Sequence, residues 1–171
     1  ITTYQLRVFK VKNAICEDVF MDEHIKIIGK VKFLKEPFFD YCLKNISWWT
    51  QKHNLYSNRQ VIDFLNLRRT DNKLIKAKLS LKNRITRFLK LNIYCKSPLF
   101  IRAFLFFIFK YFFLLGFLDG RQGLIYNFLQ CFWYRFLIDV KIKELKAFAK
   151  NKNISLIDSV YPVLGINLDK K

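Results

Sequence analysis

The most strongly apolar part of the chain runs from Pro98 to about Phe148, where two long aromatic-rich segments flank a short polar turn, Asp119–Gly123. Ser97 followed by Pro98 is a typical helix start, with serine as the cap and proline in the first turn. The segment 99–118 has the length of a bilayer span, which takes about 20 apolar residues. The pattern therefore predicts a hairpin of two helices.

Charged residues inside these apolar segments bear on how the hairpin meets a membrane. Arg102 and Lys110 interrupt the first segment, and a charge near mid-membrane costs roughly 2.5–3.5 kcal/mol. A helix that lies in the interface lets both cations reach lipid phosphates at little cost. In the second segment, Arg135 and Asp139 are four residues apart and suit an ion pair. We expect a shallowly embedded hairpin in preference to two spanning helices.

The chain before the hairpin mixes short strands and helices. Tyr4–Lys12 alternates apolar and polar residues, which predicts a first strand. Apolar residues on both sides of Gly29 predict two further short strands, 24–28 and 30–34. Helical spacing begins at Asn45, and the sequence Ser57–Gln60 fits a capping box that opens a second helix.

A basic amphipathic helix is expected at 73–94, where leucine, isoleucine and phenylalanine recur among lysines and arginines. The expected organisation is thus a mixed domain at 1–69, a basic linker helix at 70–96, the hairpin at 97–150, and a loosely held polar tail at 151–171.

Charge and composition narrow the class of partner. Because 52% of the residues are hydrophobic, a disordered basic protein is excluded. The net charge of +18 implies an anionic partner. Ten basic residues and one acid fall between positions 68 and 96. Nucleic acid would explain this charge, but anionic lipid also explains the adjoining apolar hairpin. We therefore expect lipid binding and no nucleic acid; the membrane-binding residues we expect are Lys82, Arg84, Arg87, Arg102, Lys110 and Arg121.

Cysteine usage offers no metal site or disulfide framework. Cys16, Cys42, Cys95 and Cys131 are scattered without a Cys-x-x-Cys pair or a nearby pair of histidines, which favours reduced thiols. No Asp-x-Asp sequence is present to bridge a metal and a phosphate. The sequence starts without a signal peptide in what already resembles a strand, and we expect that a front half is missing.

An acidic cluster is the first candidate for chemistry; it comprises Glu17, Asp18, Asp22, Glu23 and His24. A carboxylate on a loop between strands can act as a general base, with its pKa tuned by a neighbouring carboxylate or histidine. The alternative, which composition alone favours, is a solvated loop that offsets a basic protein.

An aromatic and polar run is the second candidate; it comprises Trp48, Trp49, Lys52, His53, Asn54 and Tyr56. Aromatic faces beside lysine, histidine and asparagine suit a sugar or a phosphate. The alternative, which the pattern alone favours, is that the tryptophans belong to the core and His53 is a satisfied surface group.

Four blocks of sequence, in this order, resemble the family 2 glycosyltransferases of bacterial surface polysaccharide and lipopolysaccharide assembly. The blocks are Arg7–Lys10, Met21–His24, Trp48–Ser57 and Leu118–Leu124, and the likeness covers roughly residues 1–148. The resemblance implies an α/β fold: a partial GT-A-like domain of short strands plus helices, then the basic helix and an interfacial hairpin. Residues 1–69 would be the acceptor side of that domain.

The resemblance also implies a mechanism, an inverting single displacement. Glu23, with Asp22 as second choice, would be the base that deprotonates the acceptor hydroxyl. His24 and the aromatic and polar run would support the acceptor. A nucleotide sugar and a divalent metal, Mg or Mn, would be held by a donor half whose ligands are not in this chain. The acceptor would be a lipid-linked or lipopolysaccharide-core sugar at the cytoplasmic face of the bacterial inner membrane.

Two other functions stay open at the level of sequence: a non-catalytic membrane-surface interaction module, and a basic nucleic-acid-binding protein. Because the donor half is absent, the chain alone is expected to show no sugar transfer.

Overall fold

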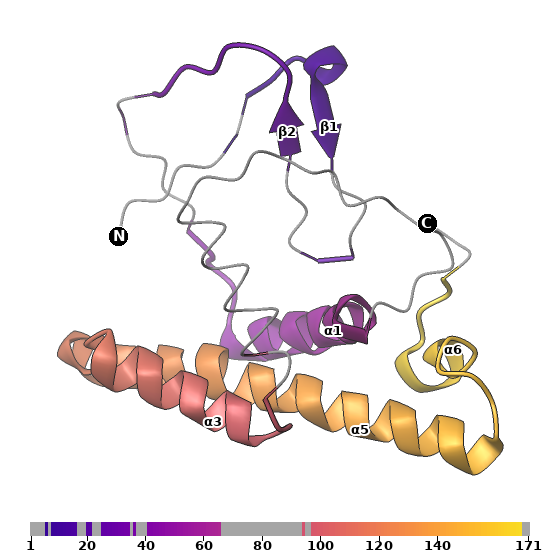
Figure 1. Ribbon diagram of the computed structural model, residues 1–171. Helices are drawn as coiled ribbons and strands as arrows, with labels where there is room; N and C mark the ends of the chain where they lie inside the picture. The colour runs from indigo at the N-terminus through magenta and orange to yellow at the C-terminus, as the bar shows by residue number, and fades with distance from the viewer. Residues whose placement is uncertain are drawn as a thin grey trace.

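The computed structural model describes residues 6, 8–16, 20–21, 25–34, 36, 41–65, 94 and 97–168. These residues are mostly helical, with one small antiparallel sheet. Figure 1 shows α1 (Ile46–Leu65) lying across α5 (Tyr134–Lys152) and α6 (Val160–Leu164) beside the far end of α5. Helix α3 (Ile101–Ile108) lies alongside the π-helical segment that leads into α5. The β1–β2 pair stands apart from the helices. The expected α/β domain of GT-A type is not confirmed by the described residues.

Helix α1 spans Ile46–Leu65 and begins as the sequence predicts. The side chain of Asn45 caps it, because its Oδ1 accepts the N–H of Trp48 at 2.9 Å. The predicted second helix start at Ser57 is wrong. Ser57 lies inside the continuous helix, where its hydroxyl donates to the carbonyl of Asn54 at 2.6 Å. The helix continues past Ser57 because Val61, one turn later, and its neighbour Ile62 are both buried.

The predicted helical hairpin is present, built from two arms with irregular segments. The first arm is α3 (Ile101–Ile108) followed by a π-helical segment, η3 (Phe109–Phe113). The second arm is continuous from α4 (Gly120–Tyr126) through the π-helical η5 (Asn127–Trp133) to α5 (Tyr134–Lys152).

The hairpin turn lies earlier than the sequence predicts. The chain reverses at Leu114 and Leu115, where Leu115 has a φ of 58°, and then forms a 3-10 turn, η4 (Gly116–Asp119). Most of the expected turn, Asp119–Gly123, is therefore the first turn of α4. Close packing of glycines explains the difference: a Cβ on Gly123 would lie 2.2 Å from the carbonyl oxygen of Gly116.

Paired phenylalanines hold the two arms antiparallel. Ring centroids lie 5.0 Å apart for Phe100 and Phe136, and 6.4 Å apart for Phe104 and Phe132. The next pair toward the turn, Phe107 and Phe128, also lies at 6.4 Å. Since such ring pairs stabilise beyond their buried area, this ladder fixes the register of the arms.

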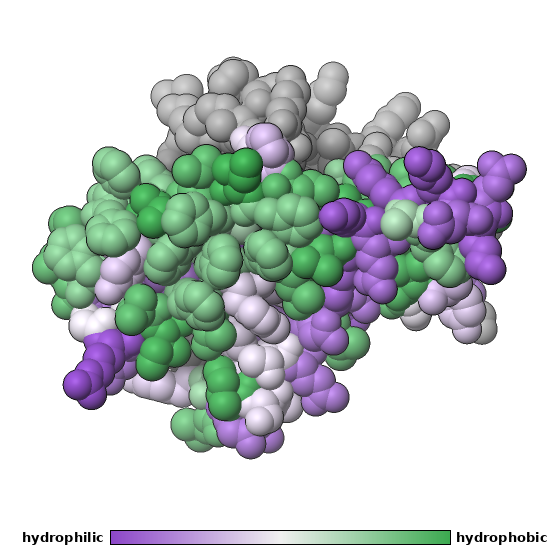
Figure 2. All heavy atoms as spheres, turned by 90° about the horizontal axis from the view of Figure 1, so that it is seen from below, coloured by the Kyte–Doolittle hydropathy of each residue, from purple (hydrophilic) through white to green (hydrophobic). Residues whose placement is uncertain are grey.

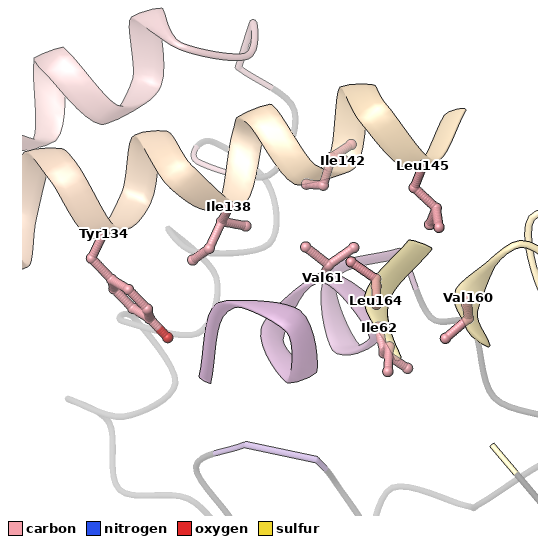
Figure 3. Close-up of a cluster of buried hydrophobic side chains, with 8 residues drawn as sticks. All are labelled: Val61, Ile62, Tyr134, Ile138, Ile142, Leu145, Val160 and Leu164. Carbon is pink, nitrogen blue, oxygen red and sulfur yellow. The ribbon is translucent and has the colours of Figure 1, made fainter. Parts of the chain in front are cut away.

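The hydrophobic core lies where α1, α5 and the short helix α6 (Val160–Leu164) meet (Figure 3). Its fully buried members include Val61 and Ile62 from α1 and Ile138 and Leu145 from α5. The remaining members are Tyr134, Ile142, Val160 and Leu164.

The expectation of a loosely held tail from residue 151 is wrong. Helix α5 continues to Lys152, and Val160 is fully buried in the core. The amide of Asn58 on α1 also donates to the carbonyl of Leu164 at 3.0 Å. Two apolar residues four positions apart are enough to make this short segment part of the core.

The small sheet is only partly as predicted. β2 (Ile25–Ile27) confirms the strand before Gly29, but its antiparallel partner is β1 (Ala14–Cys16), with Ala14 opposite Ile27. Residues 30–34 form no strand. The described part of the predicted first strand is irregular at 8–10 and a 3-10 turn, η1, at Val11–Asn13. Val8 and Val11 are largely exposed, so alternation there reflects no buried face.

Candidate functional site

The expected catalytic residues Asp22, Glu23 and His24 lie outside the described residues, as do Glu17 and Asp18. The chain immediately before Asp22 is anchored to α1. The carboxylate of Asp63 accepts the backbone N–H of Phe20 at 3.2 Å and that of Met21 at 2.9 Å. Sequence reasoning did not single out Asp63, since its partners lie more than 40 positions away.

Half of the aromatic and polar run on α1 packs toward α5. The Trp49 and His53 rings stack with centroids 3.6 Å apart, and His53 meets the Tyr134 ring edge-on at 5.3 Å. The Nδ1 of His53 is 2.9 Å from the carbonyl oxygen of Trp49, one turn earlier. Trp133 approaches Trp49 at 6.1 Å. These contacts give Trp49 and His53 a packing role between the two helices.

The other half of the run forms a strip with a cation between two rings. The Nζ of Lys52 is 4.7 Å from the centroid of Trp48 and 5.3 Å from that of Tyr56. Trp48 is 37% exposed. Exposed aromatic faces beside a cation can stack on a sugar or contact an anionic group. Trp48, Lys52 and Tyr56 thus form one cation–π strip along α1, and Tyr56 also packs against the hydrophobic core.

Asn54, the remaining member, accepts hydrogen bonds from Lys141 of α5. The Nζ of Lys141 lies 2.9 Å from the carbonyl oxygen of Asn54 and 2.6 Å from its side-chain oxygen. Ser57 Oγ at 2.7 Å and the side-chain oxygen of Asn58 complete a set of neutral acceptors. Burial lowers the pKa of Lys141 to about 8. Because this amine is saturated with acceptors, it joins α1 to α5 and offers no donor to a ligand.

Arg102 is buried, which corrects its expected role as a membrane-binding cation. Its side chain is 3% exposed and forms an ion pair with the fully buried Asp139; the Arg102 Nε lies 2.8 Å from Asp139 Oδ1. The other carboxylate oxygen of Asp139 accepts the N–H of Phe100 at 2.8 Å, at the start of α3. Asp139 therefore pairs across the hairpin, and the predicted Arg135–Asp139 pair is wrong.

Arg135, left without that carboxylate, is surrounded by rings. Its guanidinium carbon lies 5.9 Å from the Tyr94 centroid and 5.6 Å from those of Phe106 and Tyr134. Its Nε is buried and has no hydrogen-bond partner among the described residues. Sequence spacing pointed to Arg135 but assigned it the wrong partner.

Of the remaining cations that were expected to bind a membrane, the structure describes two. Lys110 on η3 is half-buried and Arg121 on α4 is exposed. Lys82, Arg84 and Arg87 lie outside the described residues, as does the predicted basic helix apart from Tyr94.

The hairpin carries a large exposed apolar surface. Figure 2 shows hydrophobic side chains gathered over the hairpin and hydrophilic ones toward the end where α5 finishes. The exposed large apolar residues of this surface are Ile101, Phe104, Leu105, Phe109, Phe112, Phe113, Leu114, Leu115, Phe117, Leu118, Leu124, Ile125, Tyr126 and Phe128. Apolar patches of this extent mark sites that contact a protein, a membrane or a ligand. We call this surface the hairpin face.

Within the described residues, no helix by itself has the length and apolarity to cross a membrane, whereas the two arms together, Ile101–Phe113 and Gly116–Lys152, meet that criterion as a bent pair. Nor do any three or more His, Cys, Asp or Glu side chains in this part of the protein gather to hold a metal ion.

Comparison with known proteins gives no relative: no family model, no curated protein and no solved structure matches the chain.

Proposed function

We propose that the chain docks on an anionic membrane surface through the hairpin face and serves there as the acceptor side of a glycosyltransferase. The observation that carries the docking is the exposure of the hairpin face. Each apolar side chain left in water forgoes about 25 cal/mol per Å² of buried surface. A membrane interface recovers this free energy without a dedicated protein partner.

The charges around the hairpin face support a lipid surface over a second protein. Lys110 and Arg121 flank the turn, whose exposed residues Phe112–Leu115 are all apolar. Long cationic side chains next to an apolar tip reach phosphates while their stems stay in the acyl region. The net charge of +18 adds a general attraction to anionic lipid.

The glycosyltransferase part rests on the four family-like blocks. Two of them are described: Trp48–Ser57 on α1 and Leu118–Leu124 at the start of the second arm, and α1 packs on that arm. A third block, Met21–His24, begins at Met21, which Asp63 of α1 holds. The strip of Trp48, Lys52 and Tyr56 is suited to an acceptor sugar.

In the proposed reaction, Glu23 or Asp22 takes the proton of the acceptor hydroxyl as its oxygen attacks the anomeric carbon and the nucleotide leaves. In this proposal a separate donor domain would bind the nucleotide sugar and the divalent metal that the resemblance implies. The acceptor is a lipid-linked or lipopolysaccharide-core sugar, and the reaction takes place at the cytoplasmic face of the bacterial inner membrane.

Vesicle flotation tests the docking. The chain is expected to float with phosphatidylcholine vesicles that contain phosphatidylglycerol, and less with pure phosphatidylcholine. The double variant Phe113→Asp/Leu118→Asp should lose flotation while keeping its fold, since these side chains are 73% and 69% exposed. Tyr161→Asp, also exposed but on α6, is the matched control. Flotation of the tip variant at the wild-type level would refute docking through the hairpin face.

A sugar-transfer assay distinguishes an enzyme from a non-catalytic membrane module. The purified chain should transfer no sugar from any nucleotide sugar, and turnover by it alone would show that it needs no separate donor domain. In a preparation that carries the donor half, Glu23→Gln should abolish transfer and leave flotation unchanged. Salt-dependent DNA binding without lipid affinity would instead favour a nucleic-acid-binding protein.

A further inference from the structure

We propose that Arg135, together with Lys110, forms a binding site for a phosphate group between the two arms of the hairpin. This site adds a specific chemical group to the proposed membrane docking. It rests on that docking only where a lipid headgroup is named as one source of the phosphate. The other source is a soluble phosphate ester.

Among the described residues, no carboxylate forms an ion pair with Arg135. Asp139, one turn later on α5, uses one oxygen for Arg102 and the other for the N–H of Phe100. A buried donor of a cation without an acceptor is costly, and the Nε of Arg135 is such a donor in the described structure. An anion from outside the chain would remove this cost.

The rings around Arg135 prepare it for an anion. Tyr94, Phe106 and Tyr134 come from three different segments and hold the guanidinium in place by cation–π contacts. A planar guanidinium fixed on aromatic faces still presents parallel N–H groups at its edge. This fork matches two oxygens of a phosphate, which a lysine at the same place would not.

Lys110 supplies a second cation from the opposite arm. Both Lys110 and Arg135 lie close enough to the thiol of Cys131 to act on its pKa, which burial raises and the two cations lower. Cys131 is on the second arm, one turn before Arg135, while Lys110 is on the first arm, one turn after Phe106. Phe106 contacts Arg135 and lies one turn before Lys110, so we place the phosphate between the arms on the side that both cations approach.

Thermal unfolding of the full chain tests the site, with inorganic phosphate and dihexanoyl phosphatidic acid, below its micelle concentration, as the two probes. Sodium chloride at matched ionic strength is the reference. The wild type should gain several degrees in Tm with at least one phosphate probe and none with chloride. Arg135→Gln should weaken the response tenfold or more in probe concentration, Arg135→Lys should weaken it less, and Lys150→Gln, an exposed cation at the end of α5, should match the wild type.

The outcomes are distinct. A response to phosphatidic acid alone identifies a lipid headgroup, and an equal response to inorganic phosphate identifies a soluble source; either supports the site. An unchanged response of Arg135→Gln, or no response of the wild type to both probes, overturns it. Should Arg135→Gln fail to fold, as circular dichroism would reveal, Lys110→Gln must show the weakened response instead. The tip variant Phe113→Asp/Leu118→Asp should keep the phosphate response, so failure of the site and failure of docking are separable.

Discussion

Asp139 has two partners that no local pattern connects to it. Its carboxylate neutralises Arg102, 37 positions earlier, and accepts the N–H of Phe100, where α3 begins. The helix that Ser97 and Pro98 predict begins instead at Ile101, and Asp139 binds the backbone N–H of its N-cap residue, Phe100. A carboxylate at a helix N-terminus is favoured by the helix dipole as well as by the hydrogen bond.

Replacing Asp139 with asparagine should destabilise the protein by roughly 3–5 kcal/mol, because it leaves the buried Arg102 charge without a partner. Urea unfolding followed by circular dichroism measures the free energy of unfolding. Glu144→Gln, an exposed change on the same helix, is the control and should stay within about 0.5 kcal/mol. The double variant Arg102→Met/Asp139→Leu should recover most of the loss. An Asp139→Asn variant as stable as the control would show that the pair is not buried in solution.

Lys141 predicts a pH dependence of stability. Its pKa is about 8 in the folded chain, because burial disfavours the charged amine, against 10.5 when unfolded. Between these values the unfolded state binds more protons, so the free energy of unfolding should rise from pH 8 to pH 10.5. The rise should be about 1 kcal/mol, since the side chain is only half-buried and solvent screens part of the effect.

Urea unfolding at pH 7, 8, 9 and 10 checks this. Lys141→Met should remove the rise, whereas Lys146→Met, an exposed lysine on α5, should keep it. Equal slopes for the two variants would mean that Lys141 titrates normally.

At the scale of elements, the turn of the hairpin depends on two glycines in close contact. A Cβ on Gly116 would lie 2.6 Å from the side-chain nitrogen of Asn127, and one on Gly123 would meet the carbonyl oxygen of Gly116. The side chain of Asn127 is buried and donates to the carbonyl of Gly123 at 2.8 Å. The 3-10 turn η4 is thus packed directly on α4.

Gly123→Ala should therefore destabilise the chain by about 1–3 kcal/mol, as expected when an atom is inserted into backbone contact, despite the better helix propensity of alanine. Gln122→Ala, its exposed neighbour, should be neutral or slightly stabilising. Chemical denaturation of both variants measures the difference. A stabilised Gly123→Ala would indicate that η4 does not pack on α4 in solution.

At the scale of the molecule, the core depends on α6, although this helix is only five residues long. Leu164→Ala should cost about 2–5 kcal/mol, because its buried side chain fills the junction of α1 and α5. Tyr161→Ala, which is 66% exposed on the same helix, is the matched control. Thermal unfolding of both tests the role of α6. If Leu164→Ala and Tyr161→Ala unfold together, the segment is not part of the core.

What the sequence predicted well has local causes. The start of α1 was predictable because the Asn45 side chain caps the turn that directly follows it. The hairpin was predictable from the length of two apolar segments. The Arg102–Asp139 pair was missed because its members are far apart, while Arg135 stands at the spacing that favours a local pair. Leu164 was missed because α6 is only five residues long, too short to show a helical pattern. The sequence grouped Trp48, Lys52 and Tyr56 in one run with Trp49 and His53. Only the contact that Trp49 and His53 make toward α5 distinguishes the two sets.

The second arm and the core helix are one piece of backbone. From Gly120 to Lys152 the helical chain continues without a break, over roughly 50 Å at 1.5 Å per residue. Its first half pairs with α3, and its second half supports α1 and α6. Because one continuous helix makes both sets of contacts, a tilt of the hairpin must also tilt the surface of α5 on which α1 packs. Mechanical force applied at one end is thereby transmitted to the other without any hinge between them.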